Sequence, residues 1–228
     1  VGELLNLTGI RPGQLASHEA QLPFEPIAKL FERASRLTGD ELIGFQLAPS
    51  RDLIRSAGLL AYVGVSSPSV GGYLRNIARY QRVMGDGTRT EFLETESCGE
   101  LIWRYNAGPE TPLKQYTEFG AIGTVHTLRQ LSRTMLRPER ACFAHFRSEG
   151  QGEISRFLGC DADFGVGENR LKFRRAVIEL PLETADDNLL RTLTAICEDI
   201  LARKPAPASS LIRDVERQVA EQIGRASC

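Results

Sequence analysis

The chain lacks the excess of positive charge that characterises proteins which bind nucleic acid on their own. Its 28 lysine and arginine residues are matched by 29 aspartate and glutamate residues, so the formal net charge at pH 7 is −1. A self-sufficient DNA-binding domain normally has a surplus of basic side chains, because these displace counterions from phosphates. We therefore expect that this chain does not bind DNA by itself.

Long apolar runs and paired cysteines are also missing. No stretch reaches the roughly 20 apolar residues of a membrane-spanning helix. The first residues, VGELLNLTGIRPG, lack the basic start and apolar run of a signal peptide. The five cysteines are scattered, and no two form a C-x-x-C pair, which argues for reduced thiols rather than a disulfide framework or a zinc site. We expect a cytoplasmic protein without a bound metal.

The common catalytic motifs are absent as well. The sequence has no G-x-S-x-G, H-E-x-x-H, G-x-x-x-x-G-K-[ST] or G-x-G-x-x-G pattern. The three histidines, His18, His126 and His145, are far apart and do not have metal-ligand spacing. For His145 we expect a structural hydrogen bond that holds its strand to a neighbour. These absences predict a protein that is not an enzyme and that needs no cofactor.

What the sequence does contain is a series of amphipathic helices with clear ends. Apolar residues at helical spacing predict a helix over residues 26–37. Ser67 or Ser69 can accept hydrogen bonds from free amide groups at the start of a second helix, which we expect to extend to Met84. Another helix is predicted over residues 184–203, capped by Thr184. The apolar face that we expect it to bury consists of Leu189, Leu193, Ile196 and Ile200.

Strands and one long helix are expected between these helices. Residues 90–95 and 100–105 predict a hairpin, and further strands are predicted over residues 141–146, 162–166 and 170–173. The long helix ends near residue 136, and Gly120 and Gly123 within it would let another backbone come close. Because strands and helices do not alternate strictly, we predict an α+β fold, a single domain with helices packed on a small mixed or antiparallel sheet.

The clearest boundary in the chain is the segment Lys204-Pro205-Ala206-Pro207, whose prolines make a stiff linker. A last helix is expected beyond it, with an apolar stripe formed by Ile212, Val215, Val219 and Ile223. We therefore divide the chain into a domain over residues 1–204 and a linker with a C-terminal helix over residues 205–228.

Three motifs that occur in order carry a resemblance to a known family. The first is Leu37-Thr38-Gly39-Asp40. The second lies in GLLAYVGVSSPSVGGYLRNIARY, where the matching residues are Gly58, Leu60, Tyr62, Ser66, Ser67, Pro68, Leu74, Arg79 and Tyr80. The third lies in FLGCDADFGVGENRLKF, where they are Phe157, Gly159, Phe164, Asn169, Leu171 and Phe173. The chain resembles, over nearly all of its length, the N-terminal half of AraC-type bacterial transcription regulators with the arabinose-binding-domain type of sensor.

The resemblance implies a regulatory domain that binds a small-molecule effector of unknown identity. Such a domain controls dimerisation and the DNA binding of a C-terminal helix-turn-helix domain, so the implied partners are an effector, a second copy of the chain, and DNA through that other domain. We expect the chain to be a piece of a longer protein that ends where the DNA-binding domain begins. The alternative is a natural C-terminus with a dimerising tail helix.

A second function stays open beside the sensor, namely a ligand-free dimerisation or protein-interaction module. The long helix with Gly120 and Gly123 would then provide a close helix–helix contact between two chains.

Aromatic side chains are the best candidates for an effector pocket, because such pockets are mostly apolar with a few placed polar groups. Trp103 and Tyr105 alternate with Arg104 on one predicted strand, so both rings project from the same face. Arg79 is either a carboxylate clamp or part of an ion pair, at the surface or structural. The remaining candidates, which ordinary core packing explains as well, are Tyr62, Tyr80, Phe119, His126 and Phe146.

Overall fold

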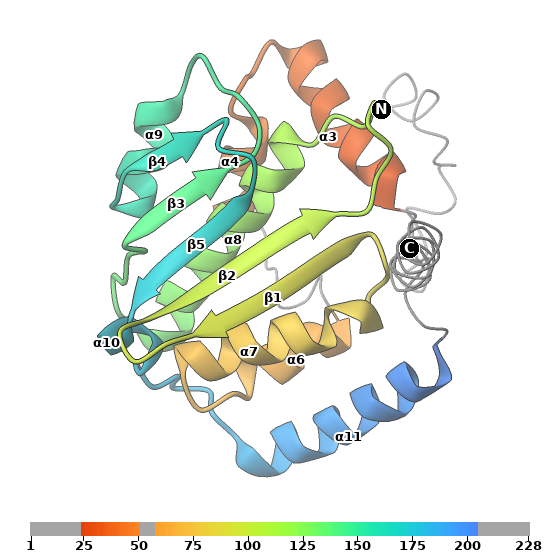
Figure 1. The fold of residues 1–228 in the computed structure, drawn as a ribbon, viewed down its shortest axis with the longest axis vertical. Helices are drawn as coiled ribbons and strands as arrows, with labels where there is room; N and C mark the ends of the chain where they lie inside the picture. The colour runs from red at the N-terminus through yellow and green to blue at the C-terminus, as the bar shows by residue number, and fades with distance from the viewer. Residues whose placement is uncertain (1–23, 51–57, 205–228) are drawn as a thin grey trace, which may run out of the picture.

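The computed structural model describes residues 24–50 and 58–204. They form one mixed sheet with helices packed on it, which confirms the predicted α+β class (Figure 1). The strands lie in the order β1-β2-β5-β3-β4, and neighbours are antiparallel except for the parallel pair of β3 and β4. The strands are β1 Thr88–Glu94, β2 Cys98–Tyr105, β3 Arg140–Phe143, β4 Ala162–Phe164 and β5 Asn169–Arg174.

The helices form a layer behind the sheet and a second group beside its edge strand β1. Figure 1 shows α8 crossing behind the strands, and α3 and α4 pack against α8. At the other end, α7 packs on β1, α6 packs on α7, and α11 packs on α6 and on the short 3-10 helix η1. The helices are α3 Phe24–Thr38, α4 Ile43–Ser50, α6 Gly58–Val65, α7 Val70–Tyr80, η1 Gln81–Val83, α8 Lys114–Ser132, α9 Gln151–Leu158, α10 Arg175–Ile178 and α11 Asp187–Arg203.

The two faces of the sheet differ in polarity, as expected when one face packs on helices and the other faces water. On β5, Leu171 and Phe173 are fully buried in the main core. Arg170 and Lys172 alternate with them and form ion pairs on the opposite face, both with Glu100 of β2. This alternation fixes which side chains of β1 and β2 point toward α8.

The local signals at the ends of the second helix are confirmed in part. Ser69 caps α7, and its hydroxyl accepts a hydrogen bond from the Gly72 amide at 3.1 Å. The α-helix ends at Tyr80, however, and continues only as the 3-10 turn η1. Met84 is consequently exposed rather than turned inward.

The strand expected over residues 141–146 is shorter than predicted. β3 ends at Phe143 because the next amide, that of Ala144, donates to the Asn169 side chain at 3.0 Å. The backbone then leaves the sheet, and the side chain of Phe146 is 83% exposed.

The helix predicted over residues 184–203 is present, but its cap and its buried face are not the expected ones. Asp186, not Thr184, caps α11 by accepting hydrogen bonds from the amides of Asn188 and Leu189. The side chains that pack on α6 and α7 are Leu190, Leu193, Cys197 and Leu201. Leu189 and Ile196 lie on the other side and are 43% and 45% exposed.

The expected close approach at Gly120 is also not observed. A Cβ atom at Gly120 would meet nothing nearer than the Tyr105 hydroxyl, at 4.0 Å. The tight contact lies instead at Gly44 of α4, where a Cβ atom would come within 2.0 Å of the carbonyl oxygen of Gln115 on α8. Gly123 is buried within the domain, together with nine other residues of α8.

The predicted linker and last helix, over residues 205–228, lie outside the described residues. Within residues 24–50 and 58–204, no helix is long and apolar enough to cross a membrane.

Candidate functional site

A cavity of about 150 Å³ lies between the inner face of the sheet and helices α7 and α8. Its sheet wall comes from β1 and β2, where the register pairs Thr90 with Trp103 and Thr88 with Tyr105. Side chains two residues apart on a strand share a face, so both aromatic rings and both hydroxyls point toward α8. The structure thus places the two leading candidates, Trp103 and Tyr105, in the wall of one cavity.

The helical wall of the cavity is formed by one face of α8 and by the end of α7. Tyr116, Gly120 and Thr124 follow one another at intervals of four residues and therefore lie along the same side of α8. Ile77 of α7 and Gln81 of η1 close the cavity near β1. Because Gly120 has no side chain, the space beside it stays open.

The aromatic wall has few free hydrogen-bonding groups. The Trp103 indole Nε1 donates to the Tyr105 hydroxyl oxygen at 3.1 Å, so the indole offers its ring face to the cavity. The Tyr105 ring in turn stacks on Phe24 with centroids 5.1 Å apart. Burial raises the pKa of Tyr105 and of Tyr116, and both phenols are therefore neutral at physiological pH.

Three of the predicted site residues lie elsewhere on the helical side of the domain. Tyr62 of α6 is 48% exposed and does not line the cavity. Phe119 packs its ring against Phe31 of α3, with centroids 4.9 Å apart. His126 lies further along α8, beside the ring of Phe157. Phe146, exposed after the end of β3, is likewise not part of the cavity.

Arg79 and Tyr80 form a junction with α11 instead of lining the cavity. The Tyr80 hydroxyl donates to Glu198 Oε1 at 2.8 Å, and Arg79 Nη2 lies 2.6 Å from the same oxygen. Tyr80 is buried beside Cys197 in a second apolar cluster. Arg79 thus forms an ion pair with Glu198 in which both side chains are largely exposed, 64% and 49%.

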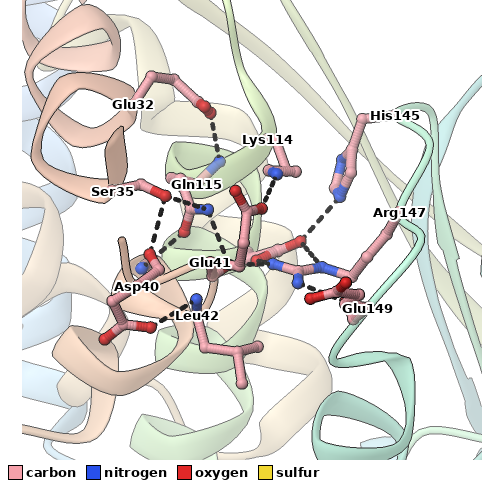
Figure 2. A network of polar contacts seen from close by, with 12 residues as sticks. Glu32, Ser35, Asp40, Glu41, Leu42, Lys114, Gln115, His145, Arg147 and Glu149 are labelled. Atoms are coloured by element: carbon pink, nitrogen blue, oxygen red, sulfur yellow. Dashed lines mark hydrogen bonds and ion pairs between the residues drawn. The ribbon is translucent and has the colours of Figure 1, made fainter. Parts of the chain in front are cut away.

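A buried ionic network occupies the opposite side of α8 (Figure 2). Glu118, which is fully buried, receives the Arg147 guanidinium on both carboxylate oxygens, with N–O distances of 2.7 and 2.5 Å. His145 Nε2 lies 2.9 Å from Glu118 Oε1. The hydrogen bond expected for His145 is present, and its partner is a helix rather than a neighbouring strand.

The same network holds the segment between α3 and α4 against α8 (Figure 2). The backbone amide of Gln115 donates to the Glu32 carboxylate at 2.6 Å, and the side-chain oxygen of Gln115 accepts from the backbone amide of Gly44 at 2.9 Å. Arg147 donates to the Glu41 carbonyl at 2.7 Å, and Gln115 Nε2 donates to that carbonyl at 2.8 Å. The carboxylate, guanidinium and amide groups of Glu118, Arg147 and Gln115 thus have partners, whereas Nδ1 of His145 is buried without one.

Sequence reasoning missed the polar lining of the cavity and, apart from the hydrogen bond of His145, the network. Thr88 and Thr90 alternate opposite Trp103 and Tyr105, so the hairpin register would have found them. The contacts between Glu118 and Arg147, and between Glu32 and Gln115, join segments far apart in the chain, and no local pattern indicates them. Within the described residues, no group of three or more His, Cys, Asp and Glu side chains could hold a metal ion.

Comparison with known proteins identifies the family. Residues 1–182 match the family described as the arabinose-binding domain of AraC transcription regulators, N-terminal. The chain therefore belongs to this family of regulator domains.

Individual relatives agree with this assignment. The chain is 25% identical over 203 residues to the ornithine utilization regulator of Pseudomonas aeruginosa, a match that covers 87% of this chain and 58% of the regulator. Its fold is similar to the crystal structure of the transcriptional regulator CdpR from Pseudomonas aeruginosa, with a TM-score of 0.61 and 16% sequence identity over 86% of this chain and 60% of the other. The chain thus spans less than two thirds of the length of either relative.

Proposed function

We propose that this domain binds a small-molecule effector in the cavity between β1, β2 and α8, and that binding regulates a transcription factor of which it is part. The observation that carries the proposal is a concave site, lined by Trp103 and Tyr105, in a domain of a regulator family. The lining side chains within the described residues include no carboxylate, histidine, cysteine or lysine. The proposed role is therefore binding without catalysis.

The route from the cavity to the C-terminal end of the described chain runs through α7 and η1. Gln81 lines the cavity, while the preceding Tyr80 binds Glu198 of α11. Lys204, directly after α11, donates from Nζ to the backbone carbonyl of Arg82 at 2.6 Å. A ligand that shifts η1 would thus shift the point at which the proline-containing linker begins. An effector acts in this way only if it prefers one of two positions of α11.

DNA binding and dimerisation complete the proposal. DNA would be bound by a helix-turn-helix domain beyond the described residues, and paired half-sites require paired domains. Leu189 and Ile196 form an exposed apolar stripe on α11, on the face turned away from α6. This stripe favours a second copy of the chain as a partner.

The binding step is tested with a cavity-filling variant and a matched control. In Gly120→Leu, the new side chain enters the open space of the cavity. In Gly152→Leu, on the exposed face of α9, the same change meets nothing within 4 Å. Some compounds of a metabolite library should raise the melting temperature of the wild-type domain and of Gly152→Leu. Gly120→Leu should lose this response, and a response retained in that variant would place the ligand elsewhere.

The coupling step is tested in the complete gene product with two adjacent residues of α11. Glu198→Ala removes the partner of Tyr80 and Arg79, whereas Asp199→Ala removes only an exposed ion pair with Arg203. We expect Glu198→Ala to weaken the effect of the effector on DNA affinity while effector affinity stays the same. Equal effects of the two variants would contradict the proposed route.

The alternative function, a ligand-free dimerisation module, is favoured by the same exposed stripe on α11. It predicts a tight dimer in analytical ultracentrifugation that Ile196→Glu converts to monomer, together with no response to any compound. A ligand response that Gly120→Leu abolishes would exclude this alternative.

A further inference from the structure

The described residues that line the cavity carry no formal charge. Among the described residues that line it, none is Asp, Glu, Lys, Arg or His. The tyrosine phenols of the wall stay neutral, because burial raises the pKa of Tyr105 and Tyr116. A charged ligand group would thus lose part of its hydration in the cavity without gaining an ionic partner, which is unfavourable.

The volume of the cavity matches a ligand group of about one ring. Apolar cavities of about 150 Å³ in other proteins hold a single benzene molecule. Trp103, Tyr105 and the apolar side chain of Ile77 border this space. Aromatic rings pack favourably against such walls in stacked or edge-to-face arrangements.

A few uncharged polar groups remain available at the cavity. The hydroxyls of Thr88 and Thr90 and the amide of Gln81 line it, and none of them has a hydrogen-bond partner within the described part of the chain. On the helical wall, the Thr124 hydroxyl donates to the Gly120 carbonyl at 2.8 Å and can still accept a hydrogen bond. These groups fit a hydroxyl, amide or carbonyl substituent.

We propose that the effector is a neutral single-ring compound with a hydroxyl, amide or carbonyl group, and that the cavity excludes carboxylates, amines and amino acids. This inference rests on the proposed function, because it names the ligand class of the same cavity. Its ring would lie against Trp103, and its polar group would point toward Thr88, Thr90 and Gln81.

The test uses three probes that share one ring and differ in charge. Benzyl alcohol is neutral, benzylamine is a cation and benzoate is an anion at neutral pH. Trp103 is the only tryptophan of the chain, so its intrinsic fluorescence reports binding at the cavity itself. We expect a saturable change with benzyl alcohol, and dissociation constants at least about tenfold higher for both ions, which corresponds to about 1.4 kcal/mol. The change should persist in Gly152→Leu and disappear in Gly120→Leu.

A designed reversal of charge provides a second measurement. Gln81→Glu keeps the shape of the side chain and adds a carboxylate at the cavity. Benzylamine should then bind at least about fivefold more tightly than it binds the wild-type domain, a gain of about 1 kcal/mol, while benzyl alcohol changes little. An unchanged affinity for benzylamine would contradict the proposed contact between Gln81 and the polar group of the ligand.

The measurements distinguish a wrong ligand class from a wrong function. The ligand class is wrong, although the cavity still binds an effector, if an ion binds as tightly as benzyl alcohol. The same conclusion follows if only charged metabolites quench the fluorescence of Trp103 and this quenching is lost in Gly120→Leu. If no compound of either kind changes Trp103 fluorescence or the melting temperature, the proposed function fails together with the inference.

Discussion

The two sides of helix α8 differ in burial and in chemistry, because Gly120 and Thr124 are half-buried whereas Gln115 and Glu118 are fully buried. One side, with Gly120 and Thr124, borders a cavity whose described lining is uncharged and leaves the Thr88, Thr90 and Gln81 side chains without partners in the described part of the chain. The other side, with Gln115 and Glu118, belongs to a network in which carboxylate, guanidinium and amide groups are all paired. The difference indicates a division of roles, in which one side recognises a ligand and the other holds the wall in place.

A rigid wall matters for the recognition of a small molecule. Preorganised sites bind more tightly because less conformational entropy is lost on binding. Fully paired buried networks make a structure rigid, whereas a network with one partner missing is costly. Arg147 joins Glu118 of α8 to the carbonyl of Glu41 before α4, so it fixes α8 relative to the helices behind it.

The largest expected effect is the loss of the carboxylate at the centre of the network. Glu118→Ala leaves the buried guanidinium of Arg147 without its ionic partner, and breaking such a pair costs about 3–5 kcal/mol. Glu183→Ala breaks the exposed pair with Arg133 and should cost at most about 1 kcal/mol. Urea denaturation measures both free energies of unfolding. Similar small losses in the two variants would show that the network is not a scaffold.

Local sequence patterns predicted those features of the domain that depend on a single helix or strand. The period of two along a strand placed Trp103 and Tyr105 on one face, and the Ser69 cap marked the start of α7. The prediction for the buried side of α11 was wrong because the helix has two overlapping apolar stripes, and both stripes contain Leu193. Only the position of α6 selects the stripe with Leu190 and Cys197.

The network could not be predicted because it depends on long-range contacts. The side chain of Arg147 lies 29 residues from that of Glu118 and 106 residues from the carbonyl of Glu41 in sequence. Single charged residues on amphipathic helices are usually exposed, and nothing in the neighbouring sequence distinguishes Glu118 from such residues. Its burial follows from the packing of α4 and the segment after β3 around α8.

A smaller effect comes from the same substitution made on the two sides of α8. Gly44→Ala places a methyl group against the backbone of Gln115, where overpacking costs about 1–3 kcal/mol. Gly120→Ala adds a methyl group at the cavity without a close contact, and should stabilise the helix by up to about 1 kcal/mol. Thermal denaturation should therefore show shifts of opposite sign. Shifts of the same sign would mean that the two sides of α8 are equally tightly packed.

The smallest expected effect concerns His126, which lies on α8 outside both the cavity and the network. Partial burial, with a smaller contribution from the Arg129 cation, lowers its pKa below the ordinary value of 6.5. As the pH falls, the unfolded chain therefore takes up a proton at His126 before the folded domain does. The neutral imidazole contributes to the stability of the folded domain above about pH 6.5, and this contribution is lost as the pH falls through the lowered pKa. His126→Gln should reduce the loss of stability between about pH 7.5 and about pH 5.5, as measured by urea denaturation at each pH. Because the ring is partly exposed, we expect a smaller change than for either pair of variants above. An unchanged pH dependence in His126→Gln would assign the acid sensitivity to other groups.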